Sequence, residues 1–219
     1  MLIIADVLSS EEVARVREGL TDAPMVDGKK TAGTEARKVK ANRQANPADA
    51  GVQGLMRLVR RALDRNAVFQ LYARPARLTG VRFNLYGEGE FYGPHLDEAM
   101  LDLGEVRLRT DCSFTLFLSE PESYDGGELV IAGTEGERQL KPRAGALVVY
   151  ATGAVHQVNP VTRGERLAAV GWVQSLIRRP DAREVMFDLG RARASMAQGD
   201  ACLLVDKAIA NLMRIWGEP

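Results

Sequence analysis

Two histidines, His95 and His156, are the only imidazole side chains in this chain of 219 residues. Asp97 follows His95 by two positions in the segment Gly93-Pro-His-Leu-Asp97. On an extended segment, residues two apart point to the same face, so the imidazole and the carboxylate can reach one ion. Two imidazoles and one carboxylate form the facial triad of non-haem Fe(II) sites. The same ligands also suit catalytic zinc, so these residues alone leave the metal open.

Arg166 stands ten residues after His156, at the start of the apolar run Leu167-Ala-Ala-Val-Gly-Trp172. A buried arginine on such a strand needs an anionic partner, because the burial of an unpaired charge is unfavourable. Its planar guanidinium matches a carboxylate in bidentate geometry, so a dicarboxylate cosubstrate would satisfy it. The alternative is an arginine at a sheet edge, in solvent or paired with a surface acid.

Many short strands separated by turns must position these residues. From Leu78 onward, Val81, Phe83 and Leu85 alternate with Arg82, Asn84 and Tyr86. Further strand-like runs are expected at Cys112–Leu118, Glu128–Ala132, Ala146–Ala151, Val155–Val158 and Leu167–Leu176. This spacing favours a sandwich or barrel over alternating βαβ units. The chain is therefore predicted to be mainly β with flanking helices, around a jelly-roll core.

Helical patterns precede the strands. Ser9 and Glu12 have capping-box spacing, which predicts a helix over residues 10–20. Asn46-Pro47 is interpreted as the cap and first turn of a second helix, whose apolar stripe is Val52, Leu55, Met56, Val59 and Leu63. Between these helices, residues 27–46 are glycine-containing and basic without an apolar period, which predicts a loop or mobile flap.

Residues 178–219 are predicted to form a helical extension of a domain that spans residues 1–177. Asp181 and Asp200 are expected to cap its two helices. The second helix has more apolar residues than a cap on a jelly roll needs, namely Leu203, Leu204, Leu212 and Ile215. We therefore expect a homodimer that forms through these C-terminal helices.

Composition narrows the possible partners and the location. Lys and Arg number 29, as do Asp and Glu, so the net charge is zero and gives no overall attraction to phosphates. The longest uncharged stretch is too short and polar to span a bilayer, so no membrane partner is expected. The N-terminus lacks a basic signal-peptide region, and Cys112 and Cys202 lie far apart. These features predict a cytoplasmic protein with reduced thiols.

A series of motifs follows in order along the chain: Asn84-Leu-Tyr86, Tyr92-Gly-Pro-His-Leu-Asp97, Asp125-Gly-Gly-Glu-Leu129, Ala144-Gly-Ala-Leu147, His156, Arg166 and Trp172. This order resembles the Fe(II)/2-oxoglutarate-dependent dioxygenases of the prolyl 4-hydroxylase type. More narrowly, it resembles the bacterial PKHD-type hydroxylases. The similarity covers nearly the whole chain, including residues 119–128 and 160–166 and the helical tail.

The resemblance implies a double-stranded β-helix with Fe(II) on His95, Asp97 and His156. It also implies that 2-oxoglutarate chelates the iron through its keto acid end, while its far carboxylate meets Arg166. Tyr86 takes the place of a tyrosine that relatives often have near the cosubstrate, although it also suits packing within a strand.

The resemblance says less about the roles of three other aromatic residues. Several prolyl hydroxylases have a tyrosine that binds the cosubstrate where this chain has Phe117. If that contact exists here, it must come from another residue. Tyr92 and Trp172 rank below Tyr86 as candidates for the cosubstrate site.

The implied reaction consumes O2 and 2-oxoglutarate, releases succinate and CO2, and hydroxylates a C–H bond of a small-molecule or peptide substrate. Halogenating relatives lack the carboxylate ligand, so the presence of Asp97 favours hydroxylation. L-Ascorbate, which rescues over-oxidised iron, is an expectation from the family alone. The sequence does not identify the primary substrate.

Two alternatives stand beside this interpretation. A noncatalytic metal-binding jelly-roll module would keep the metal ligands but has no reason to keep Arg166 behind them. A nucleic-acid oxidative demethylase would use the basic residues between Lys29 and Arg43 as phosphate contacts. The nearby acids Asp27 and Glu35 and the zero net charge favour a solvated loop over that second alternative.

Overall fold

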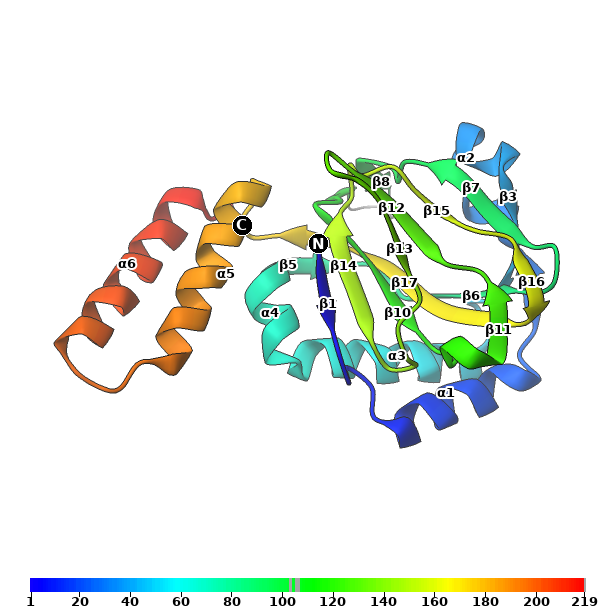
Figure 1. Cartoon of the computed structure of the whole chain (residues 1–219), viewed down its shortest axis with the longest axis horizontal. Helices are drawn as coiled ribbons and strands as arrows, with labels where there is room; N and C mark the ends of the chain where they lie inside the picture. The colour runs from blue at the N-terminus through cyan, green and yellow to red at the C-terminus, as the bar shows by residue number, and fades with distance from the viewer. Residues whose placement is uncertain (103, 105–106, 219) are drawn as a thin grey trace.

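The computed structural model describes residues 1–102, 104 and 107–218, and these residues form a pair of antiparallel sheets that lie face to face (Figure 1). The larger sheet has the strand order β1 (Leu2–Ile4), β14 (Leu147–Ala151), β10 (Cys112–Phe117), β17 (Arg166–Ser175), β6 (Arg82–Tyr86), β4 (Arg43–Ala45) and β2 (Met25–Asp27), and β5 (Pro75–Leu78) also pairs with β17. The smaller sheet has the order β13 (Gly136–Leu140), β12 (Leu129–Gly133), β15 (His156–Val158), β7 (Phe91–His95) and β3 (Lys40–Ala41). This architecture confirms the predicted jelly roll.

The larger sheet is covered on both faces, which explains why β10 is buried at every position. Its side chains alternate, so that Phe114 and Leu116 join a core shared with the helices. Phe117 instead belongs to a second core, between the two sheets, with Val148 and Tyr150 of β14. The face of the larger sheet that is turned toward the smaller sheet is therefore the one that can line a site.

Helices α1 (Ser10–Thr21), α3 (Ala50–Arg65) and α4 (Ala67–Ala73) cover the other face of the larger sheet (Figure 1). The capping box predicted at Ser9 is present, because Glu12 N donates to Ser9 Oγ at 3.2 Å and Ser9 N donates to Glu12 Oε2 at 3.0 Å. Helix α3 starts later than predicted. Asp49 caps it by accepting from Val52 N at 2.9 Å, whereas Asn46 forms a turn before the helix.

The prediction of a loop or flap over residues 27–46 was wrong in part. This segment contains η1 (Gly28–Thr31), α2 (Thr34–Lys38), β3 and β4. The strands are too short to show a period, and they form because β3 pairs with β7 and β4 pairs with β6. The polar residue Gln44 is satisfied inside the fold, since its Nε2 donates to Asn84 Oδ1 at 2.6 Å.

The remaining elements lie at the ends of the core or beyond it. Two further pairs of strands each form a two-stranded sheet: β11 (Tyr124–Gly126) with β16 (Val161–Gly164), and β8 (Met100–Asp102) with β9 (Arg107–Arg109). The short helix η2 (Pro121–Ser123) precedes β11. Helices α5 (Pro180–Ser195) and α6 (Asp200–Trp216) pack as a pair that extends from the sheets in Figure 1. Asp181 and Asp200 do not cap them, because each lies in the first turn and neither N-cap has a side-chain hydrogen bond.

None of the helices in the described residues is long and apolar enough to span a bilayer.

Candidate metal centre

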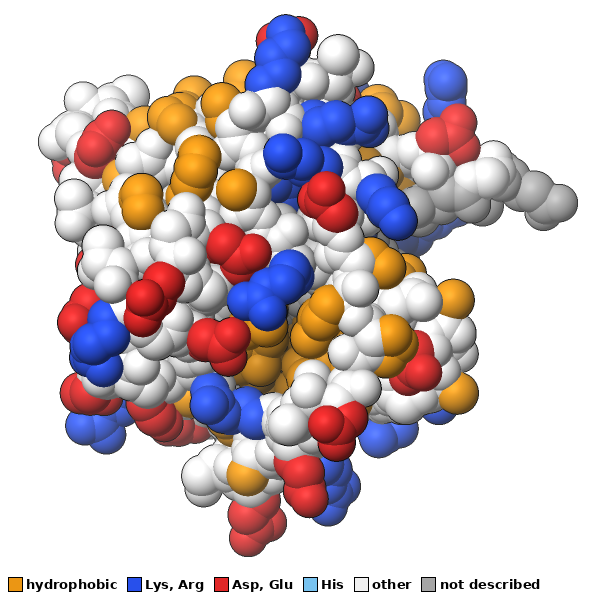
Figure 2. Space-filling model, turned by 90° about the vertical axis from the view of Figure 1, so that its right-hand side faces the viewer, with side chains coloured by type: hydrophobic (Ala, Val, Ile, Leu, Met, Phe, Trp, Pro, Cys, Tyr) orange, Lys and Arg blue, Asp and Glu red, His pale blue; other side chains and the backbone are white. Residues whose placement is uncertain are grey.

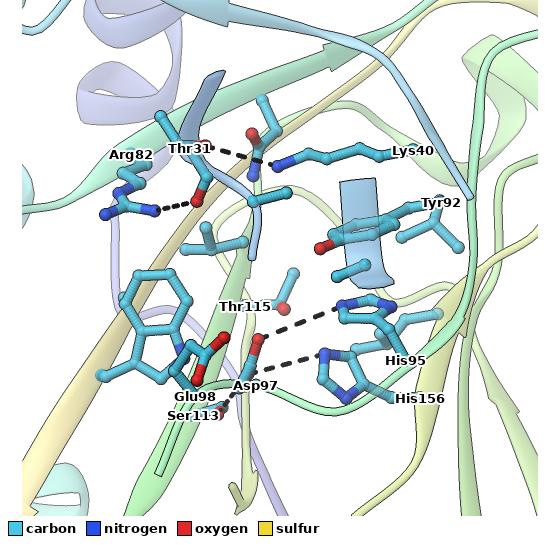
Figure 3. A pocket seen from close by; sticks show the side chains of 18 of the residues that line it. Thr31, Lys40, Arg82, Tyr92, His95, Asp97, Glu98, Ser113, Thr115 and His156 are labelled. Atoms are coloured by element: carbon cyan, nitrogen blue, oxygen red, sulfur yellow. Dashed lines mark hydrogen bonds and ion pairs between the residues drawn. The ribbon is translucent and has the colours of Figure 1, made fainter. Parts of the chain in front are cut away.

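A direct pairing of two strands brings the two histidines together. His95 ends β7, His156 begins β15, and the two residues are partners in the antiparallel register. Facing residues on such strands have Cβ atoms about 5 Å apart, and here the imidazole ring centroids are 4.3 Å apart. Asp97 lies two residues beyond β7, and its Oδ2 is 3.6 Å from Nε2 of His156 (Figure 3).

The atoms that could bind a metal converge on one point. One ligand atom from each of His95, Asp97 and His156 lies within 4.8 Å of the other two. Nδ1 of His95 lies 2.8 Å from the carbonyl oxygen of Gly93, and Nδ1 of His156 lies 3.0 Å from that of Ala154. A carbonyl oxygen can only accept, so each Nδ1 carries a proton, and in the neutral ring Nε2 is then the nitrogen with the lone pair for an ion.

The carboxylate of Asp97 is held from the larger sheet. Ser113, on the β10 face that is turned toward the smaller sheet, donates from Oγ to Asp97 Oδ2 at 2.7 Å. Ser113 Oγ also lies 3.1 Å from Thr152 Oγ1, in a buried contact. Hydrogen bonds of this kind orient metal ligands and are a regular feature of metal sites.

The environment keeps His95 neutral, as a metal ligand must be. Its side chain is 5% exposed, and burial, followed by the nearby charge of His156, lowers the pKa of His95 to about 4. The ring of Tyr92 stacks on the His95 ring, with centroids 3.5 Å apart and an interplanar angle of 13°. Tyr92 thus fixes the imidazole plane, a role that the sequence did not reveal.

The three side chains lie in a pocket between the sheets, and Arg166 lines the same pocket. Arg166 begins β17 and is only 1% exposed. Its Nε and Nη2 atoms are buried and have no hydrogen-bond partner in the described protein. The guanidinium carbon lies 5.2 Å from the ring centroids of both Tyr86 and Phe117. A buried, unpaired guanidinium in a pocket is a site for an anion, and the fork geometry suits a carboxylate.

Two tyrosines adjoin Arg166. Tyr86 lies opposite it in the register of β6 and β17, lines the pocket, and has its pKa raised to about 12 by burial. Tyr124, on β11, is fully buried, and its hydroxyl has no hydrogen-bond partner in the described protein. Both Tyr124 and Arg166 pack on Gly127, where an added Cβ would lie 3.0 Å from each side chain. Tyr124 could not be identified as a site residue from the sequence, because its position in a turn does not indicate burial.

Most basic residues of the segment 29–43 are engaged within the protein. Lys38 pairs with Glu35 at 2.7 Å, Arg43 lies 3.3 Å from Glu90, and Lys40 is buried. In Figure 2, basic and acidic side chains are interspersed around a hollow on the face shown. Acidic side chains therefore lie next to the basic ones on this face.

Comparisons with known proteins agree with this geometry. Residues 81–174 match the 2OG-Fe(II) oxygenase superfamily, a range that includes both histidines, Asp97 and Arg166. The chain is 49% identical over 223 residues to a PKHD-type hydroxylase of Maricaulis maris, with 100% of both chains covered. It is 47% identical to a PKHD-type hydroxylase of a Synechococcus strain, covering 100% of this chain and 99% of the other.

Solved structures support the fold. A Pseudomonas putida prolyl-4-hydroxylase superposes with a TM-score of 0.53 and 24% identity, covering 80% of this chain and 91% of that one. A Trichoplax adhaerens prolyl hydroxylase, solved with a peptide of hypoxia inducible factor, gives a TM-score of 0.58 at 16% identity and covers 86% of each chain. At these identities the likeness establishes the arrangement of the sheets.

Proposed function

The chain belongs to the PKHD-type hydroxylases of the 2OG-Fe(II) oxygenase superfamily, and we propose that His95, Asp97 and His156 hold its iron. The protein is an Fe(II)- and 2-oxoglutarate-dependent dioxygenase whose primary substrate is unidentified. The bound iron and cosubstrate supply the oxidation of a C–H bond by O2, with release of succinate and CO2. The donor set of two neutral imidazoles and one carboxylate fits Fe(II) without a thiolate.

Arg166 binds the far carboxylate of 2-oxoglutarate, and the observation that supports this most strongly is its unpaired burial. An arginine that is 1% exposed, with two unsatisfied nitrogens, needs an anion that the described protein does not supply. Tyr86 forms one wall of this subsite. Tyr124 packs beside Arg166 over Gly127, and its buried hydroxyl has no partner in the described protein.

The other residues of the site orient the metal ligands and shield them from water. Ser113 holds the Asp97 carboxylate through its hydroxyl proton, and the two backbone carbonyls fix each ring in the tautomer that carries its proton on Nδ1 and turns Nε2 toward the ion. Tyr150, buried on β14, packs edge-on against His156 with ring centroids 5.1 Å apart. These contacts exclude water from the inner side of the metal site and leave the side toward η1 and α2 for the substrate.

Two further features of the enzyme belong to the same proposal. We place it in the cytoplasm, because Cys112 and Cys202 are both buried free thiols, as is usual in a reducing compartment. L-Ascorbate is proposed as the reductant that restores iron after turnover without substrate. This is tested by whether ascorbate increases the total succinate formed per chain before inactivation.

A homodimer through the C-terminal extension, residues 178–219, is also proposed. On α6, Leu203, Leu204 and Ile215 are exposed by 68%, 64% and 70%. Leu212, which the sequence predicts on the same surface, packs instead with the cluster around Met186. Light scattering at micromolar concentration tests this proposal, since a monomer mass would contradict it. Leu203→Glu should convert the dimer to a monomer without loss of the iron site.

The oxygenase assignment to this site is tested by anaerobic spectroscopy. Addition of 2-oxoglutarate to the Fe(II) protein should produce a visible metal-to-ligand charge-transfer band. Admission of O2 should then yield succinate, slowly when no primary substrate is present. A wild-type protein that shows no such band would contradict the assignment.

A further inference from the structure

The pocket has a second cationic region on the wall formed by β3 and β6. Lys40 is 5% exposed, and Arg82 is half-buried. Lys40 Nζ lies 3.5 Å from Thr31 Oγ1, and Arg82 Nη1 donates to the Thr31 carbonyl at 3.3 Å (Figure 3). The two positive groups therefore meet at one residue of η1, on the side of the pocket that the metal ligands do not occupy.

Neither cation has an acidic partner among the residues that the structure describes, where no carboxylate oxygen lies within 4.0 Å of either. Lys40 lies over the Tyr92 ring at 4.7 Å, and Arg82 lies over the Trp172 ring at 4.9 Å. Aromatic faces attract cations but do not neutralise them. Burial, followed by the charge of Arg82, lowers the pKa of Lys40 to about 8, which is typical of a cation without a counter-ion.

Trp172 adds an unmatched donor to the same pocket. Its indole Nε1 is buried and has no hydrogen-bond partner in the described protein. A buried N–H group left unpaired is unfavourable, so a ligand oxygen that accepts from it is favoured. Two cations without counter-ions and an unpaired N–H donor thus line one pocket, and an oxyanion is the ligand that such groups favour.

The iron and its cosubstrate do not need these cations. The charges of Fe(II), Asp97, the two carboxylates of 2-oxoglutarate and Arg166 cancel. The other ionised side chains that line the pocket are Lys40, Arg82 and Glu98. Even when the exposed carboxylate of Glu98 is counted against Lys40 and Arg82, one positive charge is left over after the proposed reactants are bound.

We propose that Lys40, Arg82 and Trp172 bind an oxyanion of the primary substrate, a carboxylate or a phosphoryl group. The substrate of this hydroxylase is therefore an anion, held by this group so that a C–H bond faces the iron. This inference rests on the proposed function, because it uses the same pocket and assigns its second cationic region to the substrate.

The test uses the fluorescence emission of Trp172. The chain has two tryptophans, and Trp216→Phe leaves Trp172 as the reporter. This protein, loaded with Fe(II) and 2-oxoglutarate under argon, is titrated with inorganic phosphate and, separately, with acetate at constant ionic strength. Saturable changes in Trp172 fluorescence are expected. The anion that binds with the higher affinity indicates whether the substrate carries a phosphoryl group or a carboxylate.

Charge-removing variants are then compared in the same background. Lys40→Met and Arg82→Met should each weaken binding of the preferred anion at least tenfold, whereas Arg82→Lys should retain it within about threefold. Lys30→Met, which removes an exposed lysine next to Thr31, is the matched control and should change nothing. The affinity for 2-oxoglutarate, read from the charge-transfer band, should stay within twofold of wild type in every variant, which also shows that they fold.

The proposal is overturned if neither anion alters Trp172 emission, or if Lys40→Met and Arg82→Met bind the anion as wild type does. It is also overturned if these variants lose affinity for 2-oxoglutarate, because the cations would then belong to the cosubstrate subsite. Failure of the oxygenase assignment is distinguishable, since the charge-transfer band reports the iron and cosubstrate whereas Trp172 emission reports the anion.

Discussion

Arg166→Ala should weaken the binding of 2-oxoglutarate to the Fe(II) protein by about 30- to 5,000-fold. The range corresponds to the roughly 2–5 kcal/mol that is lost when one partner of a buried charge pair is truncated. Arg166 belongs in this class because it is 1% exposed and two of its nitrogens have no partner in the described protein. In the variant, the far carboxylate of the cosubstrate would be buried without a counter-ion.

The assay is an anaerobic titration of 2-oxoglutarate, followed by the charge-transfer band. Arg166→Lys should bind with an intermediate affinity, because a point charge replaces a planar fork. Arg163→Ala is a matched control, since this arginine on β16 is exposed and pairs with Asp125 at 2.7 Å. The affinity for Fe(II) in the absence of cosubstrate should barely change in any of these variants.

An Arg166→Ala variant that binds 2-oxoglutarate as tightly as wild type would contradict the role of Arg166 in binding the cosubstrate. A variant that loses both iron and cosubstrate would refute it too, because the guanidinium would then support the metal site.

Three further expectations follow from the described contacts. Ser113→Ala should weaken Fe(II) binding about 10- to 100-fold, since it removes the 2.7 Å hydrogen bond to Asp97, and unchanged affinity in a metal titration would contradict this role. Burial raises the pKa of the Cys112 thiol to about 11, so this thiol stays protonated at pH 8. At that pH, the native protein should therefore react with iodoacetamide far more slowly than the unfolded protein does. Phe114→Ala should lower the free energy of unfolding by about 3–5 kcal/mol, because Phe114 is 1% exposed and packs edge-on against Phe69. A loss below about 1 kcal/mol in denaturant titrations would count against this packing.

The alternation of side chains along the strands was predictable from the sequence. Phe83 and Leu85 of β6 pack toward the helices, and Asn84 and Tyr86 line the pocket, as a period of two requires. The same rule explains why Ser113, between buried neighbours on β10, reaches Asp97. Ser113 could have been found from the alternation, although a lone serine in an apolar run gives no chemical signal.

Contacts between distant segments could not be predicted in this way. The register that places His156 opposite His95 depends on the pairing of strands separated by about 60 residues, and no local pattern encodes it. The short strands β3 and β4 were predicted as loop, because their hydrogen bonds come from β7 and β6 and not from a period of their own.

The boundary of the C-terminal extension stays a prediction. The packing of Tyr72 against Phe187, with ring centroids 5.2 Å apart, joins α5 to α4 of the main domain. Exposed leucines on α6 form an apolar face, and this face is the one that we propose a second copy of the chain covers.

The stoichiometry of iron in wild type and in Asp97→Ala tests the proposed metal site most directly. Wild type should bind one Fe(II) per chain and form succinate from 2-oxoglutarate in the presence of O2. Asp97→Ala should bind Fe(II) much more weakly and form no succinate, whereas Glu98→Ala, which removes the adjacent exposed carboxylate, should keep full iron affinity. Full iron affinity and turnover in Asp97→Ala would contradict the assignment of the metal to His95, Asp97 and His156.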